Sequence, residues 1–328
     1  MNINSKFNSF FIISILLIFL FVSSSVYAVE SGETGVNTVS STTDGSSNDD
    51  INAKDITRWT LLGGTLPAVF LFGLKSWDWG NRHSPYSRNE GWFAEDTSFG
   101  GADKAGHLLA HYAIQRGMYS VFDWTENGGS NKWPYSIGLT MGVGLFIEIG
   151  DAYTSAYGFS KEDLIIDYIG ILTGALLDYS PMLDGFIGFS MQYVPSDGYR
   201  AGYKKGEMVK YCLDIVNDYS GNQYMMNFKV AGFRNLGFDL PLPLRLISID
   251  LGFYTKGYTH YDEGKYAKEK ERDIFVGISI NTSQLLSEIW PEEHRGIAYK
   301  VPHTFFQYYH VPYDLVPVPT RYVNDLND

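Results

Sequence analysis

The spacing of apolar and polar residues changes near residue 184. Before it, apolar runs of helical length are separated by short polar turns, and after it apolar and polar residues alternate. A period near 3.6 is typical of helices, and a period of two is typical of strands. The sequence therefore predicts an α+β fold, with a helical hairpin bundle in residues 54–180 followed by an antiparallel β meander in residues 181–290.

Four helices are expected in the bundle. They cover Ile56 to Leu74, a segment that begins near Asp103, Tyr135 to Asp151, and Ser160 to Leu177. Pro67 predicts a kinked or two-part first helix, because proline removes a hydrogen bond inside a helix. The pairs Gly138/Gly142 and Gly170/Gly174 predict close contacts between helices, because a glycine at every fourth position lets backbones approach.

The β region contains four alternating segments. They are residues 187–193, 224–231, 247–253 and 274–280, and a short helix around Ser283 to Trp290 follows them. An open sheet packed against the helices is favoured over curvature towards a barrel, because closed barrels generally need at least eight strands. Residues 291–328 carry five prolines among aromatic residues, so we expect a tail that wraps over the surface.

The N-terminus has the pattern of an export signal. A short start with Lys6, an apolar run and small residues up to Ala28 predict a signal peptide over residues 1–28, with an uncleaved anchor helix as the alternative. Residues 29–53 are rich in Ser, Thr, Gly and Asp and are expected to form a disordered linker. The sequence therefore predicts an exported protein of the periplasm or outer membrane.

Composition narrows the classes of partner. The net charge of −12 argues against nucleic acid and is compatible with a divalent cation. Aromatic residues make up 16% of the chain, which suits both a membrane–water interface and an antiparallel sheet. We expect an envelope membrane or lipid as the partner, with Trp77, Trp79, Trp92 and Phe93 in a loop at that interface. A single cysteine, Cys212, excludes an intramolecular disulfide.

Candidate chemistry begins on the second helix. Asp103, His107 and His111 are spaced by four residues, so on a helix they project from one face. Two histidines beside a carboxylate resemble a transition-metal site, although histidines on helices are more often structural. For Asp103, the alternative is that its carboxylate caps the start of the helix.

Acidic residues at the ends of the next two helices extend this cluster. Glu148 and Asp151 end one helix, while Asp163 and Asp167 lie in the first turns of the following one. Carboxylates brought together by a hairpin require a cation, a shared proton, or neutralisation by His107 or Lys104. The alternative for Asp151 and Asp163 is helix capping. Glu148 and Asp167 have apolar neighbours, which indicates burial.

These motifs resemble a known family. They are Asp103-Lys104-Ala105-Gly106-His107, then Glu148-Ile149-Gly150-Asp151, then the stretch from Gly158 to Leu164 with Asp167 and Gly170. In this order they resemble the YfiM-like predicted periplasmic lipoproteins, a domain of unknown function, and more distantly the VanZ-like envelope family linked to glycopeptide resistance. The resemblance implies an envelope protein. The chain departs from it in lacking a cysteine after the signal, and in having His111 where the family often has a small residue.

Three functions are compatible with these observations. The first is a non-enzymatic, periplasm-facing, membrane-associated envelope protein whose polar cluster is structural or binds a cation. The second is a metal-assisted hydrolase or transferase acting on an envelope lipid or glycan, and the third is a small outer-membrane β protein. The candidate catalytic residues are His107, Glu148 and Asp151, and the candidate ligands of a divalent cation are Asp103, His107, Glu148, Asp151 and Asp167.

Overall fold

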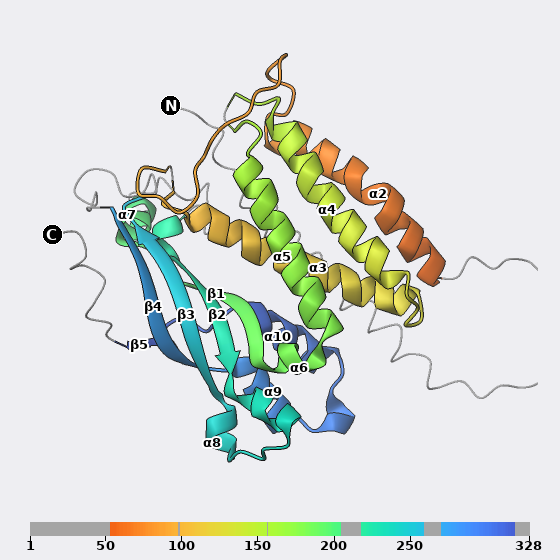
Figure 1. Cartoon of the computed structure of the whole chain (residues 1–328), viewed down its shortest axis with the longest axis vertical. Helices are drawn as coiled ribbons and strands as arrows, with labels where there is room; N and C mark the ends of the chain where they lie inside the picture. The colour runs from red at the N-terminus through yellow and green to blue at the C-terminus, as the bar shows by residue number, and fades with distance from the viewer. Residues whose placement is uncertain (1–52, 98, 156, 205–217, 259–269, 319–328) are drawn as a thin grey trace, which may run out of the picture.

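A computed structural model describes most of the chain. It covers residues 53–97, 99–155, 157–204, 218–258 and 270–318 (Figure 1). The predicted signal peptide, nearly all of the predicted linker and Cys212 lie outside the described residues.

Four long helices form the first half of the molecule. They are α2 (Ala53–Ser76), α3 (Ala102–Thr125), α4 (Lys132–Asp151) and α5 (Lys161–Tyr179). Figure 1 shows α2, α4 and α5 running side by side, with α3 crossing them. The predicted bundle is confirmed. Of the two forms expected for this segment, the two-part helix is wrong, because α2 continues through Pro67.

The helix starts differ from one another in how they are capped. The side chain of Ser160 accepts a hydrogen bond from the backbone N–H of Asp163 at the start of α5, as its sequence predicts. Helix α3 instead follows Gly101, which has φ of 92° and gives no side-chain cap. Glycine adopts this left-handed backbone at little cost. Asp103 is therefore not the cap of α3, and its carboxylate is free for another role.

Only one of the two glycine pairs marks a close helix contact. A Cβ atom on Gly170 would lie 2.4 Å from the backbone oxygen of Leu108, and one on Gly174 would lie 3.0 Å from that of Tyr112. Helix α5 therefore approaches the backbone of α3 at these two glycines. Gly138 and Gly142 have nothing within 4 Å of such an atom, so the contact expected there is wrong.

An aromatic core joins α2, α3 and α4. Trp77 and Trp79 are each only 6% exposed and pack with residues that include Val69, Phe122 and Val143. Their expected position at a membrane–water interface is therefore wrong. Trp92 and Phe93, each 42% exposed, lie in the irregular segment that leads to α3.

The second half of the molecule contains one open antiparallel sheet. Its strands are β1 (Ile187–Tyr193), β2 (Asn222–Lys229), β3 (Ile247–Lys256), β4 (Glu271–Ile280) and β5 (Val316–Val318), and each pairs with the next along the chain. The meander predicted from alternation is confirmed, and β1 and β5 are its edges. The shorter helical elements around it are α6 (Pro181–Phe186), α7 (Asp197–Lys204), η4 (Tyr219–Gly221), η5 (Val230–Leu236), α8 (Leu242–Arg245), α9 (Thr282–Ile289), η8 (Glu292–His294) and α10 (Ile297–Tyr308).

The C-terminal segment is more regular than expected. Helix α10 forms in spite of Pro302 within it, where no helix is expected from the sequence. Strand β5 adds to the sheet through pairs such as Pro317 with Gly277. Proline is tolerated in this strand because β5 lies at the edge of the sheet.

Much of the sheet buries polar side chains and exposes apolar ones, although Tyr224, Met225 and Phe275 are buried. In β3, Ser248 and Asp250 are 1% and 0% exposed, whereas Ile249 and Leu251 are 44% and 46% exposed. Residues of α10 and the segment after it cover the polar face: Phe306, Gln307 and His310 lie beside Asn227 and Ser248. Alternation correctly predicted one buried face, but sequence periodicity alone does not say which face that is.

The close approach of α5 to α3 predicts contrasting effects of alanine at two helical glycines. Gly170→Ala would push a methyl group into the backbone of α3 and should lower the free energy of unfolding by about 1–3 kcal/mol. Gly142→Ala meets open space and should leave stability unchanged or raise it by up to about 1 kcal/mol, because alanine favours helix. Urea unfolding of the two variants beside the wild type measures both effects. Equal effects at both positions would contradict this packing.

Candidate functional site

The most deeply buried charge in the helical half is the ammonium of Lys104. Its Nζ lies 2.6 Å from Asp163 Oδ1, 2.8 Å from Asp103 Oδ2 and 3.0 Å from Glu90 Oε2. The side chain is 1% exposed. The three carboxylates come from the irregular segment before α3, from α3 itself and from α5. Lys104 therefore ties three parts of the chain together.

The charges at Lys104 stabilise one another. Burial alone would lower the pKa of Lys104, but Asp103, Asp163 and Glu90 hold it above the usual value. Burial would likewise raise the pKa of Asp163, yet His107 and Lys104 hold it below the usual range. Glu90 behaves differently: burial and the neighbouring charge of Asp163 raise its pKa. The network thus contains firmly charged Lys104 and Asp163, with a more readily protonated Glu90 beside them.

One helical turn further along α3, two histidines share a carboxylate. Asp167 Oδ1 lies 2.9 Å from His107 Nδ1 and 2.7 Å from His111 Nδ1. The two imidazole rings are nearly parallel, with their planes 11° apart and their centroids 6.2 Å apart. When both rings are neutral and donate an Nδ1 proton to Asp167, their Nε2 atoms have lone pairs available for a proton or a metal.

Burial differs sharply among these three residues. The side chains of Asp167 and His111 are 2% and 7% exposed, whereas that of His107 is 31% exposed. Burial would raise the pKa of Asp167, but the two histidines hold it at about 2. Burial would lower the pKa of His107, yet Asp163 and Asp167 hold it well above the usual value. Asp167 is therefore charged, and His107 is the member that solvent can reach.

Glu148 and Asp151 at the end of α4 are held by other partners. Glu148 Oε2 accepts a hydrogen bond of 2.8 Å from the backbone N–H of Ser160, and Asp151 Oδ1 accepts one of 2.8 Å from Trp79 Nε1. Burial raises the pKa of Glu148 to about 9 and that of Asp151 to about 7. Glu148 is therefore neutral near pH 7 and links the end of α4 to the start of α5.

The five candidate metal ligands do not form a single ligand set. Among the described residues, two groups of three could each hold a metal ion: His107, His111 and Asp167, and separately Glu90, Asp103 and Asp163. The second group surrounds Lys104, whose charge already occupies the centre of the three carboxylates. The first group is the better metal site because two nitrogen atoms and one oxygen atom suit a transition metal. Glu148 and Asp151 belong to neither group.

Sequence reasoning missed two partners and set aside a third. Glu90 and Trp79 lie in a segment without regular structure, so no periodicity relates them to Lys104 or Asp151. His111 was given less weight than His107, although it faces the same carboxylate. The spacing of four residues between His107 and His111 was the available signal for the pair.

Together these features define an α+β protein with a buried acid–histidine cluster on α3 and α5. Residues 89–194 match the model of a family described as predicted periplasmic lipoprotein (DUF2279), which confirms the resemblance predicted from the motifs. The description places the family in the periplasm, in agreement with the expected export. The VanZ-like resemblance stays a prediction. No curated protein and no solved structure shows significant similarity to the chain.

Of the helices in the described part of the chain, none is both long enough and apolar enough to cross a bilayer.

The raised pKa of Glu148 predicts a loss of stability at alkaline pH. The unfolded chain releases this proton near pH 4.5, whereas the folded chain keeps it to about pH 9. The free energy of unfolding should therefore fall as pH rises towards 9, by up to about 1.4 kcal/mol per pH unit from this group. His107, whose pKa is also raised, acts in the same direction, because its stabilising charge is lost at high pH.

Glu148→Gln separates the two contributions. Glutamine keeps the acceptor for the Ser160 N–H and cannot ionise, so the fall between pH 7 and 9 should become shallower than in the wild type. Urea unfolding at several pH values measures the slope, and Glu293→Gln, at a side chain that is 73% exposed, is the matched control. A slope unchanged by Glu148→Gln would show that this carboxyl is already ionised at pH 7.

Proposed function

We propose that this protein is an exported envelope protein on the periplasmic side, that it associates with a membrane through the apolar outer surfaces of its sheet and helices, and that its polar cluster is structural. The observation that carries the proposal is the reversed polarity of the sheet. A sheet that packs in water normally turns its apolar side chains to the core. Here much of the apolar face has no cover within the described residues.

The uncovered apolar face, called here the sheet face, is formed by β2, β3 and β4. Its members are between 38% and 58% exposed: Met226, Phe228, Ile249, Leu251, Ile274, Val276, Ile278 and Ile280. Cross-strand pairs such as Phe228 with Ile249 and Ile249 with Ile278 place them side by side. Helix α3 covers the same face only near β1, through Phe189 and Tyr224. Large contiguous apolar patches mark sites of interaction with membranes or proteins.

Helix α5 repeats this polarity. Its exposed positions Ile165, Ile169, Leu172 and Leu176 lie along one side, while Asp163 and Asp167 are buried on the other. Each such side chain gains about 1.5–3 kcal/mol when it is fully removed from water. A lipid surface covers patches of this kind without specific contacts. Because none of the described helices could span a bilayer, the proposal is attachment to the membrane surface.

The polar cluster supports this proposal by fixing the helices. Charges buried around Lys104 and Asp167 are stable only while α3, α5 and the segment before α3 stay together. Their partners are supplied from inside the bundle, so the outer sides of α4 and α5 can be apolar. In this proposal the cluster determines the arrangement of the helices, and the outer surfaces contact lipid.

Replacement of apolar residues on the sheet face should weaken attachment to lipid. The triple variant Ile249→Ser, Leu251→Ser and Ile278→Ser removes three exposed apolar side chains and should reduce co-flotation with phosphatidylcholine–phosphatidylglycerol vesicles about tenfold or more. Flotation of the purified protein in a density gradient measures the bound fraction.

A second triple variant is the control. Leu236→Ser, Leu244→Ser and Ile289→Ser remove side chains of similar exposure that lie outside the sheet face, and flotation should stay near the wild-type level. Absence of flotation by the wild type, or an equal loss in both triple variants, would contradict the proposal. Circular dichroism of both variants checks that they are folded.

A metal-assisted hydrolase or transferase acting on an envelope lipid or glycan is the second candidate function. The observation in its favour is the accessible His107, oriented through Nδ1 by the charged Asp167. An imidazole held in this way can act as a general base or acid through Nε2. Together with His111 it could also present nitrogen ligands to a cation that activates water.

Metal analysis distinguishes the two functions. The second predicts about one transition-metal ion per chain in the wild type and loss of that ion in His107→Ala and Asp167→Asn. The structural role predicts no bound metal and reduced stability in both variants, because each leaves a buried partner unpaired. His294→Ala, at a histidine whose side chain is 71% exposed, should change neither quantity.

A further inference from the structure

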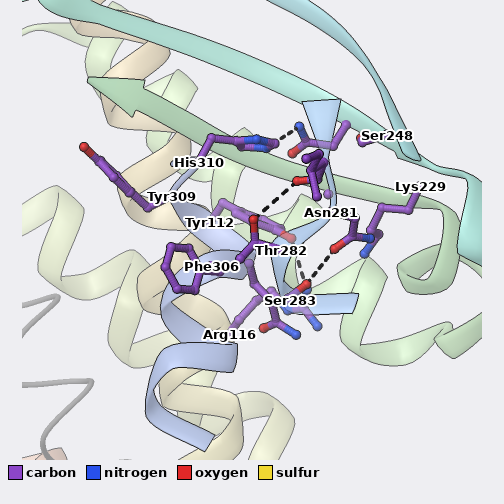
Figure 2. Close-up of a pocket in the computed structure, with 14 residues that line it drawn as sticks. Tyr112, Arg116, Lys229, Ser248, Asn281, Thr282, Ser283, Phe306, Tyr309 and His310 are labelled. Carbon is purple, nitrogen blue, oxygen red and sulfur yellow. Dashed lines mark hydrogen bonds between the residues drawn. The ribbon is translucent and has the colours of Figure 1, made fainter. Parts of the chain in front are cut away.

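A pocket lies between the polar face of the sheet and the two helices that follow it. Its walls come from α3, β1, β2, β3, the end of β4, the start of α9, and the end of α10 with the two residues after it. Figure 2 shows the aromatic rings of Phe306 and Tyr309 on one side of this pocket, with Lys229, Asn281 and Ser283 on the other. The pocket is separate from the acid–histidine cluster, because none of the cluster residues lines it.

The walls of the pocket carry positive charge and no carboxylate. Of the fourteen lining residues, Arg116 and Lys229 are cationic, and none is Asp or Glu. Arg116 is already neutralised, because its Nε lies 2.9 Å from Asp178 and its Nη1 lies 2.6 Å from Asp184. Such a local excess of positive charge contrasts with the net charge of −12 of the whole chain.

Among the described residues, Lys229 has no partner for its charge. At the end of β2 its half-buried side chain makes neither an ion pair nor a hydrogen bond with any residue that the structure describes. Burial lowers the pKa of Lys229, and the nearby Arg116 adds to this effect while Asp184 opposes it. An ammonium partly removed from water is unfavourable without a partner, so the site is suited to an anion.

The first turn of α9 provides further donors. Asn281 caps this helix through Oδ1, which accepts from the backbone N–H of Gln284 and from Ser283 Oγ. The Nδ2 amide group of Asn281 and the backbone N–H groups of Thr282 and Ser283 donate no hydrogen bond within the described part of the chain. Free N–H groups at the start of a helix favour bound anions.

From these contacts we propose that the pocket binds a phosphate group, held by Lys229, the Asn281 amide and the first-turn N–H groups of α9, with the rest of the ligand against Phe306 and Tyr309. A tetrahedral phosphate has enough acceptor oxygens to use donors from both β2 and α9 at once. The carboxylates that contact the lining residues are already engaged: Asp178 and Asp184 with Arg116, Asp250 with Asn227 and Ser248, and Asp314 with His310.

Phosphate binding can be measured directly on the purified protein. Isothermal titration with inorganic phosphate and with glycerol 3-phosphate tests a soluble ligand, and flotation with phosphatidic acid vesicles against phosphatidylcholine vesicles tests a lipid headgroup. If the wild type binds one of these phosphate compounds, Lys229→Met should weaken that binding about tenfold or more, because the substitution removes a charge-assisted contact. The proposal is supported when a soluble phosphate or a phosphatidic acid vesicle binds the wild type and this binding is lost in Lys229→Met.

Two further variants distinguish the proposed contact from unfolding or general charge effects. Lys229→Arg keeps the charge and should retain most of the binding, whereas Lys256→Gln removes a surface charge paired with Glu271 and should leave binding unchanged. Thermal unfolding shows whether Lys229→Met is folded. If that variant is unfolded, Ser283→Asp replaces it in the test: this substitution places a carboxylate in the pocket and should abolish phosphate binding. Absence of binding by all phosphate sources, or equal binding in both loss-of-charge lysine variants, would overturn the proposal.

Discussion

The ammonium of Lys104 and the carboxylates around it constrain the helical half of the molecule. A single buried charge of this kind costs several kcal/mol unless it is paired and hydrogen-bonded. Glu90, Asp103 and Asp163 meet that requirement only when the segment before α3, α3 and α5 are assembled together. The contact of Gly170 with the backbone of α3 permits the approach that these ion pairs need. Sterics and electrostatics therefore select the same arrangement of the two helices.

The same preference for buried polarity extends to the sheet. Asn227 Nδ2 donates to Asp250 Oδ1 and lies 3.1 Å from His310 Nε2, and Gln192 donates to the backbone oxygen of Val311. These hydrogen bonds hold the segment after α10 against the polar face of β1, β2 and β3. A polar sheet face can be buried only beneath elements that satisfy its hydrogen bonds, and the C-terminal segment does so. The apolar face is then the one left outside.

Much of this architecture could be predicted from the sequence, for physical reasons. The period of the apolar residues gave the four helices and four of the strands, and Ser160 with Asp163 marked the start of α5. Periodicity is a local property, so it could not identify which face of β3 is buried or relate Glu90 to Lys104. Helix α10 could not be predicted from the sequence because Pro302 lies inside it. Likewise, Gly138 and Gly142 carry the same spacing as Gly170 and Gly174 but face no neighbouring helix.

The acid–histidine cluster illustrates how far spacing determines a site. His107 and His111 are four residues apart on α3 and lie on one side of the helix. Asp103 precedes His107 by the same spacing, yet its carboxylate pairs with Lys104. The difference arises because the buried ammonium of Lys104, 2.8 Å from Asp103, needs that carboxylate as a partner. Asp167 then remains for the two histidines, and their shared attraction keeps it ionised. The sequence supplied the candidate residues, and competition between their charges decided the pairs.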